Sequence, residues 1–163
     1  AYTGCMKGLK TIDQSIADPH IYQIVKAAVQ QSGLGLVAKH GFDKEAHFKY
    51  IDKIISRFKN PYLKDDVTRV GREPLRKLSA ADRLINPTLT AQRAGVETPD
   101  LLLGIGAALH YNNAEDPQSV TMQARIAEVG LKAAVAEFAS LEADAPILDQ
   151  IVAAYSEIEK RLN

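Results

Sequence analysis

The chain has 163 residues, of which 46% are hydrophobic and 25% charged, and its 20 basic side chains balance its 20 acidic ones. This composition is typical of one globular domain and excludes a disordered or fibrous protein, and the zero net charge argues against nucleic acid as a partner. Charged residues interrupt every apolar run before it reaches the roughly 20 residues of a membrane helix, so no membrane segment is expected.

The first residues show neither the basic region nor the apolar run of a signal peptide, and they lack an initiator Met. We therefore expect them to be a cut end. Cys5 is the only cysteine of the chain and permits no internal disulfide. Because disulfides are rare in reducing compartments, the sequence favours a cytoplasmic protein.

A long helix is expected to begin at Asp18-Pro19, since Asp is a favourable N-cap and Pro fits the first helical position. Gly33 and Gly35 are expected to weaken its far end, and Gly41 is expected to cap it. The apolar residues that define it recur at helical spacing: Ile21, Ile24, Val25, Ala28 and Val29.

A second helix with one apolar stripe is expected to begin at Asp43 and to end before Asn60-Pro61. The next stretch, from Tyr62 to Leu84, is charged and is interrupted by Gly71 and Pro74. It is predicted to be broken helix and turn.

Later helices are predicted from prolines at their starts: Pro87 to Gly95, then from Thr98-Pro99, from Asp116-Pro117 through an Ala-rich stretch to Leu131, and after Pro146. The helix from Pro99 is apolar nearly all round, which places it in the core, and Gly104 and Gly106 are candidates for close approach of a neighbour. No segment alternates with period two, so the predicted fold class is all-α, a compact multi-helix domain.

Neither the glycines nor the histidines form a recognisable cofactor or metal motif. Gly33-Leu34-Gly35 and Gly104-Ile105-Gly106 lie in helical patterns without a preceding strand, so neither is assigned to a dinucleotide. The four histidines lack the paired spacing of a zinc site, and no metal is expected. His110, at the end of the apolar helix, is a candidate for a side chain that faces a cleft, beside the alternative of a hydrogen-bonded core histidine.

Arginine is concentrated between Arg57 and Leu84. Arg69, Arg72 and Arg76 follow one another at steps of three and four residues, so on a helix they would share a face and converge on one anion, such as a phosphate ester. Spacing alone leaves open the alternative that they pair with nearby carboxylates: Asp65, Asp66, Glu73 and Asp82.

This region and several shorter motifs resemble the C-terminal domain of the polyol-specific long-chain dehydrogenases. The similarity extends over the whole chain and is greatest to the members that act on mannitol 1-phosphate. The motifs are Ala1-Tyr2-Thr3-Gly4 with Thr11-Ile12, Gly41-Phe42-Asp43, Arg57-Phe58, the block from Asn60 to Val67, and Asp82-Arg83-Leu84-Ile85.

The resemblance implies a helical C-terminal domain, of the kind found in 6-phosphogluconate-dehydrogenase-like enzymes, that closes the substrate site of a two-domain enzyme. NAD would be bound mainly by an N-terminal Rossmann domain, and the catalytic Lys would lie just upstream of Ala1, so no catalytic residue is assigned here. The family's Arg and Lys that contact substrate oxygens fall on Arg69 and Lys77. Arg72 and Arg76 are added as phosphate partners, because a guanidinium holds phosphate bidentately.

The expected reaction of the intact enzyme is reversible hydride transfer between mannitol 1-phosphate and NAD, which gives fructose 6-phosphate. Its partners would be this sugar-alcohol phosphate and the Rossmann domain, and the chain alone is expected to be inactive. Apolar surface around Tyr2, Met6 and Leu9 is expected to allow self-association. Two alternatives stay open: a polyol or hexonate dehydrogenase with an unphosphorylated substrate, and a stand-alone helical binding module.

Overall fold

The computed structural model describes all 163 residues and contains eleven α-helices, one short 3-10 helix and no β-strand, which confirms the all-α prediction. An isolated antiparallel bridge joins Thr11 and Asp66. The helices are α1 (Tyr2–Met6), α2 (Ile12–Ala17), α3 (Pro19–His40), α4 (Lys44–Phe58), η1 (Pro61–Leu63), α5 (Val67–Gly71), α6 (Pro74–Leu78), α7 (Ile85–Arg93), α8 (Pro99–Leu109), α9 (Pro117–Val129), α10 (Leu131–Ala139) and α11 (Pro146–Leu162).

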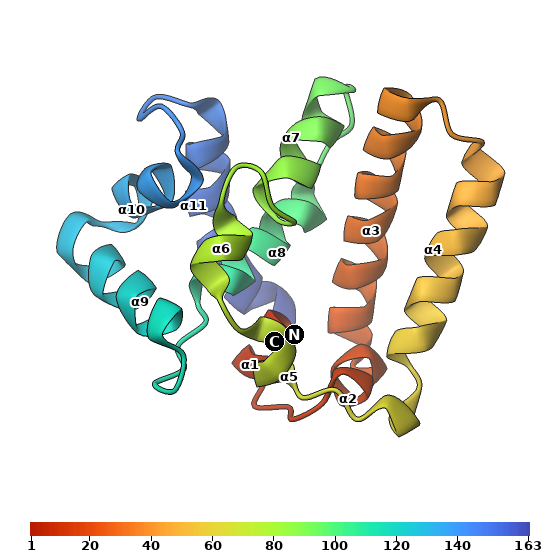
Figure 1. Cartoon of the computed structure of the whole chain (residues 1–163), viewed down its shortest axis with the longest axis horizontal. Coiled ribbons are helices and arrows are strands. Elements are labelled where there is room, and N and C mark those ends of the chain that lie inside the picture. Colours follow the sequence, from red (N-terminus) through yellow and green to blue (C-terminus); the bar gives the residue numbers. More distant parts are fainter.

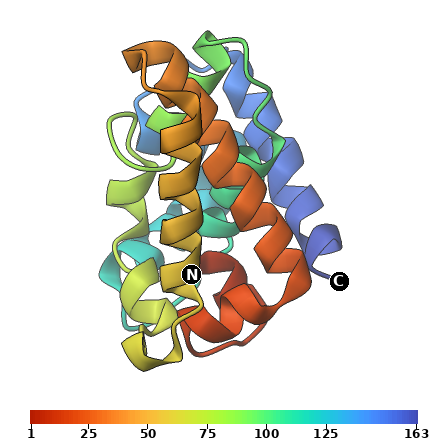
Figure 2. The same cartoon turned by 90° about the vertical axis from the view of Figure 1, so that its right-hand side faces the viewer.

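The helices pack on either side of α8 (Figure 1). The long hairpin of α3 and α4 forms one side, and α9 and α10 form the other. Figure 2 shows α3 and α4 side by side along the length of the molecule. Helix α8 contacts α3 directly and shares a buried cluster with residues of α9 and α10, so it links the two sides. No helix combines the length and the apolar character that crossing a membrane requires.

Helix α8 lies in the core, as its apolar sequence predicts. Its Leu103 and Ala107 belong to a buried cluster with residues of α3 and α11. Its Ile105 and Leu109 belong to a second cluster, which includes residues of α6, α7, α9, α10 and α11. Burial on both faces explains why this sequence carries no polar stripe.

The two glycines of α8 differ in their surroundings. A Cβ atom at Gly106 would lie 2.8 Å from the carbonyl oxygen of Ala154, so here α11 approaches the backbone closely, as expected. A Cβ atom at Gly104 would meet nothing within 4 Å. The expectation of close approach is therefore confirmed at Gly106 and wrong at Gly104.

Aspartate is the N-cap residue of three of the predicted helices. Asp18, Asp43 and Asp116 each accept hydrogen bonds from backbone N–H groups in the first turns of α3, α4 and α9. These bonds satisfy donors that a helix start otherwise leaves without a partner. The predicted starts at Pro19, Pro99, Pro117 and Pro146 are confirmed.

The glycines of α3 do not weaken the helix as the sequence suggested, since it continues to His40. They allow neighbouring helices to approach instead. A Cβ atom at Gly35 would lie 2.8 Å from the backbone of Ala91 in α7, and one at Gly33 would lie 2.6 Å from the end of the Ile51 side chain in α4. Packing therefore outweighs the low helix propensity of glycine.

Other boundaries also differ from the sequence patterns. Helix α7 begins at Ile85, so Pro87 occupies its first turn rather than its start. Gly130, with a φ of 84°, separates α9 from α10, where the sequence suggested one Ala-rich stretch. Helices α1 and α2 are too short to show a periodic apolar stripe, and the patterns did not predict them.

Candidate functional site

The residues proposed from the sequence lie on α5, on α6 and directly after α8. Arg69 belongs to α5, Arg76 and Lys77 belong to α6, and Arg72 lies in the turn between these helices. His110 follows the last residue of α8. Helix α1 packs against both α5 and α8, so the first residues of the chain lie beside this region (Figure 1).

Lys77 is buried, with an exposed fraction of only 5%. Its ammonium donates a hydrogen bond to the carbonyl oxygen of Val70, with 2.5 Å between nitrogen and oxygen, and lies 5.5 Å from the centre of the Tyr2 ring. Burial lowers the pKa of Lys77, and the charges of Arg83 and Arg76 lower it further. An ammonium has three donors, so this buried group keeps capacity for a further acceptor.

Tyr2 connects α1 to this site. Its ring meets that of Tyr111 edge to face, with 5.3 Å between the centroids, and its phenolic oxygen is buried without a hydrogen-bond partner. Burial raises the pKa of Tyr2. Gly71 permits this packing, because a Cβ atom there would lie 3.3 Å from the ring of Tyr111 and 3.4 Å from that of Tyr2.

The three arginines do not share one helical face. Helix α5 ends at Gly71 and α6 begins at Pro74, with Glu73 between them in the left-handed region at a φ of 58°. The rule that relates residues three and four positions apart therefore does not hold across this turn. The structure corrects the expectation of a single row of guanidinium groups.

Each arginine has different partners. Arg69 forms an ion pair with Asp65. Arg76 is held by two carboxylates, with Nε 2.9 Å from Glu73 and an Nη atom 3.0 Å from Asp82. Arg72 makes no ion pair. For Arg76 the structure favours the alternative of an ion-pair network, whereas Arg72 keeps its guanidinium without a carboxylate partner.

Arg69 and Arg72 line the same open cavity of about 380 Å³. Two guanidinium groups at one cavity suit an anion, because they supply charge and paired donors. The cavity also contains carboxylates, which oppose anion binding unless they are paired. The other lining residues are Thr68, Glu73, Asn113, Glu115, Asp116 and Pro117.

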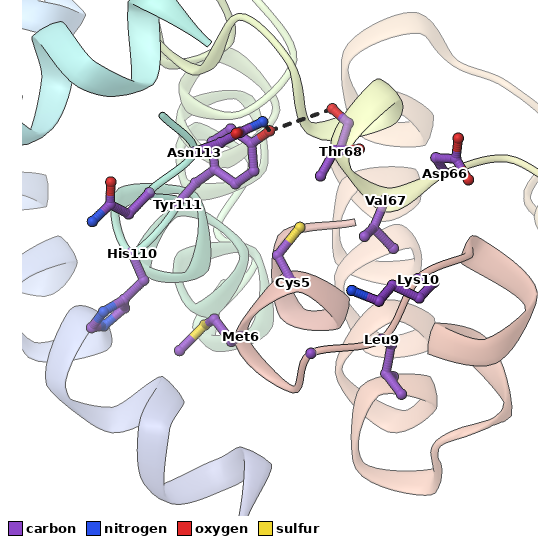
Figure 3. Close-up of a pocket in the computed structure, with 12 residues that line it drawn as sticks. Cys5, Met6, Leu9, Lys10, Asp66, Val67, Thr68, His110, Tyr111 and Asn113 are labelled. Carbon is purple, nitrogen blue, oxygen red and sulfur yellow. Dashed lines mark hydrogen bonds between the residues drawn. The ribbon is translucent and has the colours of Figure 1, made fainter. Parts of the chain in front are cut away.

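A second, larger cavity of about 490 Å³ lies between α1, the start of α5 and the loop after α8 (Figure 3). Tyr111 lines this larger cavity and is hydrogen-bonded to two residues that line both cavities. Its hydroxyl donates to the carbonyl oxygen of Thr68 at 3.4 Å and accepts from Asn113 at 3.0 Å. Thr68 and Asn113 line both cavities.

His110 lines this larger cavity, but its ring is held by α11. It stacks on Tyr155 with 3.7 Å between the ring centroids, and its Nε2 lies 2.9 Å from the Tyr155 carbonyl oxygen. Its Nδ1 lies 3.9 Å from a carboxylate oxygen of Glu159. These contacts match the alternative of a hydrogen-bonded structural histidine, and the cavity-facing role stays a proposal.

An apolar face lies beside Asp65, the ion-pair partner of Arg69. Phe58 and Val70 line a small cavity of about 170 Å³ together with Ala1. Phe58, Val70, Tyr62 and Leu63 are exposed. The sequence placed apolar surface around Tyr2, Met6 and Leu9, and these three residues are partly buried against the cluster of α3, α8 and α11. Self-association through them stays a prediction.

Sequence patterns missed three polar or aromatic residues of this region. Tyr2 was noted only in a family motif and with apolar surface, Tyr111 was given no role, and Asp116 was named only at the start of a helix. The local sequence gives the cap of Asp116 correctly but carries no signal for contacts to residues about forty positions away.

Comparison with known protein families shows that residues 1–159 match the mannitol dehydrogenase C-terminal domain. The match spans nearly every helix described above, from α1 into α11. It therefore includes α5, α6 and the residues around Lys77.

Proposed function

Because the chain belongs to the mannitol dehydrogenase C-terminal domain family, we propose that it is the substrate-side domain of an NAD-dependent oxidoreductase that interconverts mannitol 1-phosphate and fructose 6-phosphate. The closely spaced glycines of this chain lie inside α3 and α8, so NAD would bind an N-terminal Rossmann domain. When bound, NAD accepts a hydride from the secondary alcohol carbon of the substrate. The hydroxyl proton passes to a general base, which in this proposal is the Lys upstream of Ala1.

The observation that carries the proposal is the buried ammonium of Lys77. It lies next to α1, the helix that follows the position expected for the general base, and it retains donors for substrate hydroxyl groups. A buried and packed Lys holds its ammonium in one place, which suits the positioning of a polyol for hydride transfer. Arg69, on the neighbouring helix, would hold a second hydroxyl.

The phosphate is proposed to bind at the cavity shared by Arg69 and Arg72. Arg72 is the stronger candidate of the two added arginines, because it has no carboxylate partner. Arg76 would contribute mainly by fixing Glu73, and this neutralises one of the carboxylates at the cavity. His110 would line the larger cavity on the side of the substrate, with its ring held in place by the Tyr155 carbonyl of α11.

The carboxylates at this cavity favour a second candidate function, the oxidation of an unphosphorylated polyol or hexonate. Glu115 lines the cavity without forming an ion pair, so it would repel a phosphate and accept hydrogen bonds from hydroxyl groups instead. The two functions therefore differ in the expected effect of the phosphate on kcat/KM.

The exposed apolar face of Phe58, Tyr62, Leu63 and Val70 is proposed to contact the Rossmann domain. It adjoins Ala1 and Asp65, the ion-pair partner of Arg69, so a domain docked on it would bring a bound dinucleotide close to the substrate. In this chain alone the same face would support self-association.

The test is steady-state kinetics of the full-length enzyme with mannitol 1-phosphate and mannitol, following NAD reduction. A kcat/KM at least tenfold higher for the phosphate ester supports the first function. Equal values, or a preference for mannitol, would support the second. An enzyme that reduces NAD with neither polyol, nor with a hexonate, would overturn the proposal of a polyol dehydrogenase.

A further inference from the structure

The turn between α5 and α6 holds a residue in an unfavourable conformation. Glu73 has a φ of 58° and a ψ of 56°. These angles lie in the left-handed region, which residues other than Gly, Asn and Asp rarely adopt. Such a conformation persists only where surrounding contacts fix it. Glu73 lies four residues after Arg69 and four residues before Lys77. The shape of the turn therefore sets the relative placement of these two side chains.

The backbone of Glu73 is hydrogen-bonded to Asp116, at the start of α9. One carboxylate oxygen of Asp116 accepts hydrogen bonds from the backbone N–H groups of Gln118 and Ser119, at 3.0 and 3.3 Å, and so caps α9. Its other oxygen accepts from the backbone N–H of Glu73 at 2.8 Å. The side chain is buried, with 8% exposed, so each of its oxygens has a defined partner.

A second bond joins the same two elements. The side-chain oxygen of Gln118 accepts from the backbone N–H of Arg76 at 3.0 Å. In both bonds a backbone N–H of the α5–α6 segment donates to a side-chain oxygen at the start of α9. The start of α9 is therefore hydrogen-bonded to the backbone that carries the proposed substrate-binding side chains.

We infer that Asp116 is a positioning residue: it holds the Glu73 turn in its left-handed conformation and thereby places Arg69 and Lys77 for the polyol. This inference rests on the proposed function for its substrate, whereas the link between Asp116 and the turn depends on the fold alone. Asp116 would act through the backbone of Glu73 and would not need to touch the polyol.

Asp116→Asn in the full-length enzyme separates the two roles of the carboxylate. Asn is as good an N-cap as Asp, but its amide has one acceptor oxygen and one donor nitrogen. When the oxygen caps α9, the nitrogen faces the N–H of Glu73, donor to donor. Asp116→Ser is the second variant, because a Ser hydroxyl also caps a helix but is too short to reach Glu73. Asp43→Asn is the matched control, since Asp43 caps α4 through one exposed bond to Ala46.

Two measurements are made on each variant. Hydrogen exchange of peptides covering residues 71–78 reports on the turn, and both Asp116 variants are expected to exchange faster there, with Asp43→Asn unchanged. Steady-state kinetics are expected to show a loss in kcat/KM for the polyol on the order of 10- to 100-fold, the scale of a displacement of about 1 Å, with the KM for NAD unchanged.

Unchanged exchange in both Asp116 variants would show that the carboxylate does not hold the turn. Faster exchange with an unchanged kcat/KM for the polyol would overturn the positioning role. A wild-type enzyme that oxidises no polyol would instead overturn the proposed function, and the exchange data distinguish this case because they require no substrate. If Asp116→Asn does not fold, Asp116→Ser decides the same question.

Discussion

Replacement of each glycine in α8 by Ala gives a matched test of how closely α8 and α11 pack. Both positions are helical, so each replacement should gain about 1 kcal/mol in helix propensity. At Gly104 the new methyl group meets nothing within 4 Å, and this gain should appear in full as higher stability.

At Gly106 the new methyl group would meet atoms that cannot rotate away. Its Cβ would lie 2.8 Å from the carbonyl oxygen of Ala154, 2.9 Å from its carbonyl carbon and 3.0 Å from the backbone nitrogen of Tyr155. Because these are backbone atoms of α11, the helices must move apart. Overpacking of this kind costs about 1–3 kcal/mol, so Gly106→Ala should be neutral or destabilising by up to about 2 kcal/mol.

The free energies of unfolding of the two variants should therefore differ by about 1–3 kcal/mol. For a chain of this size, a difference of about 2 kcal/mol corresponds to about 4–8 °C in Tm. Urea unfolding followed by circular dichroism measures the difference, with calorimetry as a check on Tm. Equal stability of the two variants would refute the close approach of α8 and α11. The effect should reach the site, because the Tyr155 carbonyl that binds His110 belongs to the displaced segment.

The remaining predictions concern the site, the acid limb of stability and the cofactor. In the full-length enzyme, Lys77→Met should stay folded by circular dichroism but lose kcat/KM for the polyol on the order of 100-fold, and an unchanged value would exclude Lys77 from substrate binding. Arg72→Ala should raise the KM for mannitol 1-phosphate more than Arg76→Ala does, whereas Arg76→Ala should mainly lower the urea midpoint; the reverse order in KM would remove the phosphate from Arg72. The hydrogen bond from Lys7 and the backbone donors of α3 lower the pKa of Asp18 below its unfolded value of about 4, so their stabilisation is present above that pH and is lost as the pH falls through the folded pKa. Urea midpoints of Asp18→Asn and wild type, measured against pH, should therefore converge in acid, and a constant gap would contradict this linkage. The 163-residue chain alone should show no NAD binding by titration calorimetry, and micromolar affinity would contradict the proposed division between the domains.

The sequence by itself determined most of the helix starts. Asp18-Pro19 and Asp116-Pro117 act within one turn of the chain, because an Asp side chain caps N–H groups two and three residues ahead and Pro has its φ already fixed. The all-round apolar character of residues 99–109 was also sufficient to place α8 in the core. Such features depend on neighbours in the sequence, and local patterns report them reliably.

The site depended on contacts between distant parts of the chain. On a continuous helix the spacing would place Arg69, Arg72 and Arg76 on one face, but the packed turn at Glu73 interrupts the helix, and the three side chains differ in their partners. The role of Gly35 likewise reversed from loosening a helix to admitting its neighbour, because only packing shows what stands opposite a missing Cβ atom.

Tertiary structure alone decided which charged groups are buried. Lys77 is one of two lysines in the charged stretch from Tyr62 to Leu84, and its sequence neighbours give no reason for an ammonium next to the ring of Tyr2, 75 positions earlier. The bond from Glu73 to Asp116 spans 43 positions. Burial and long-range hydrogen bonds arise when elements remote in the sequence pack together and exclude water. Local periodicity does not predict which elements do so.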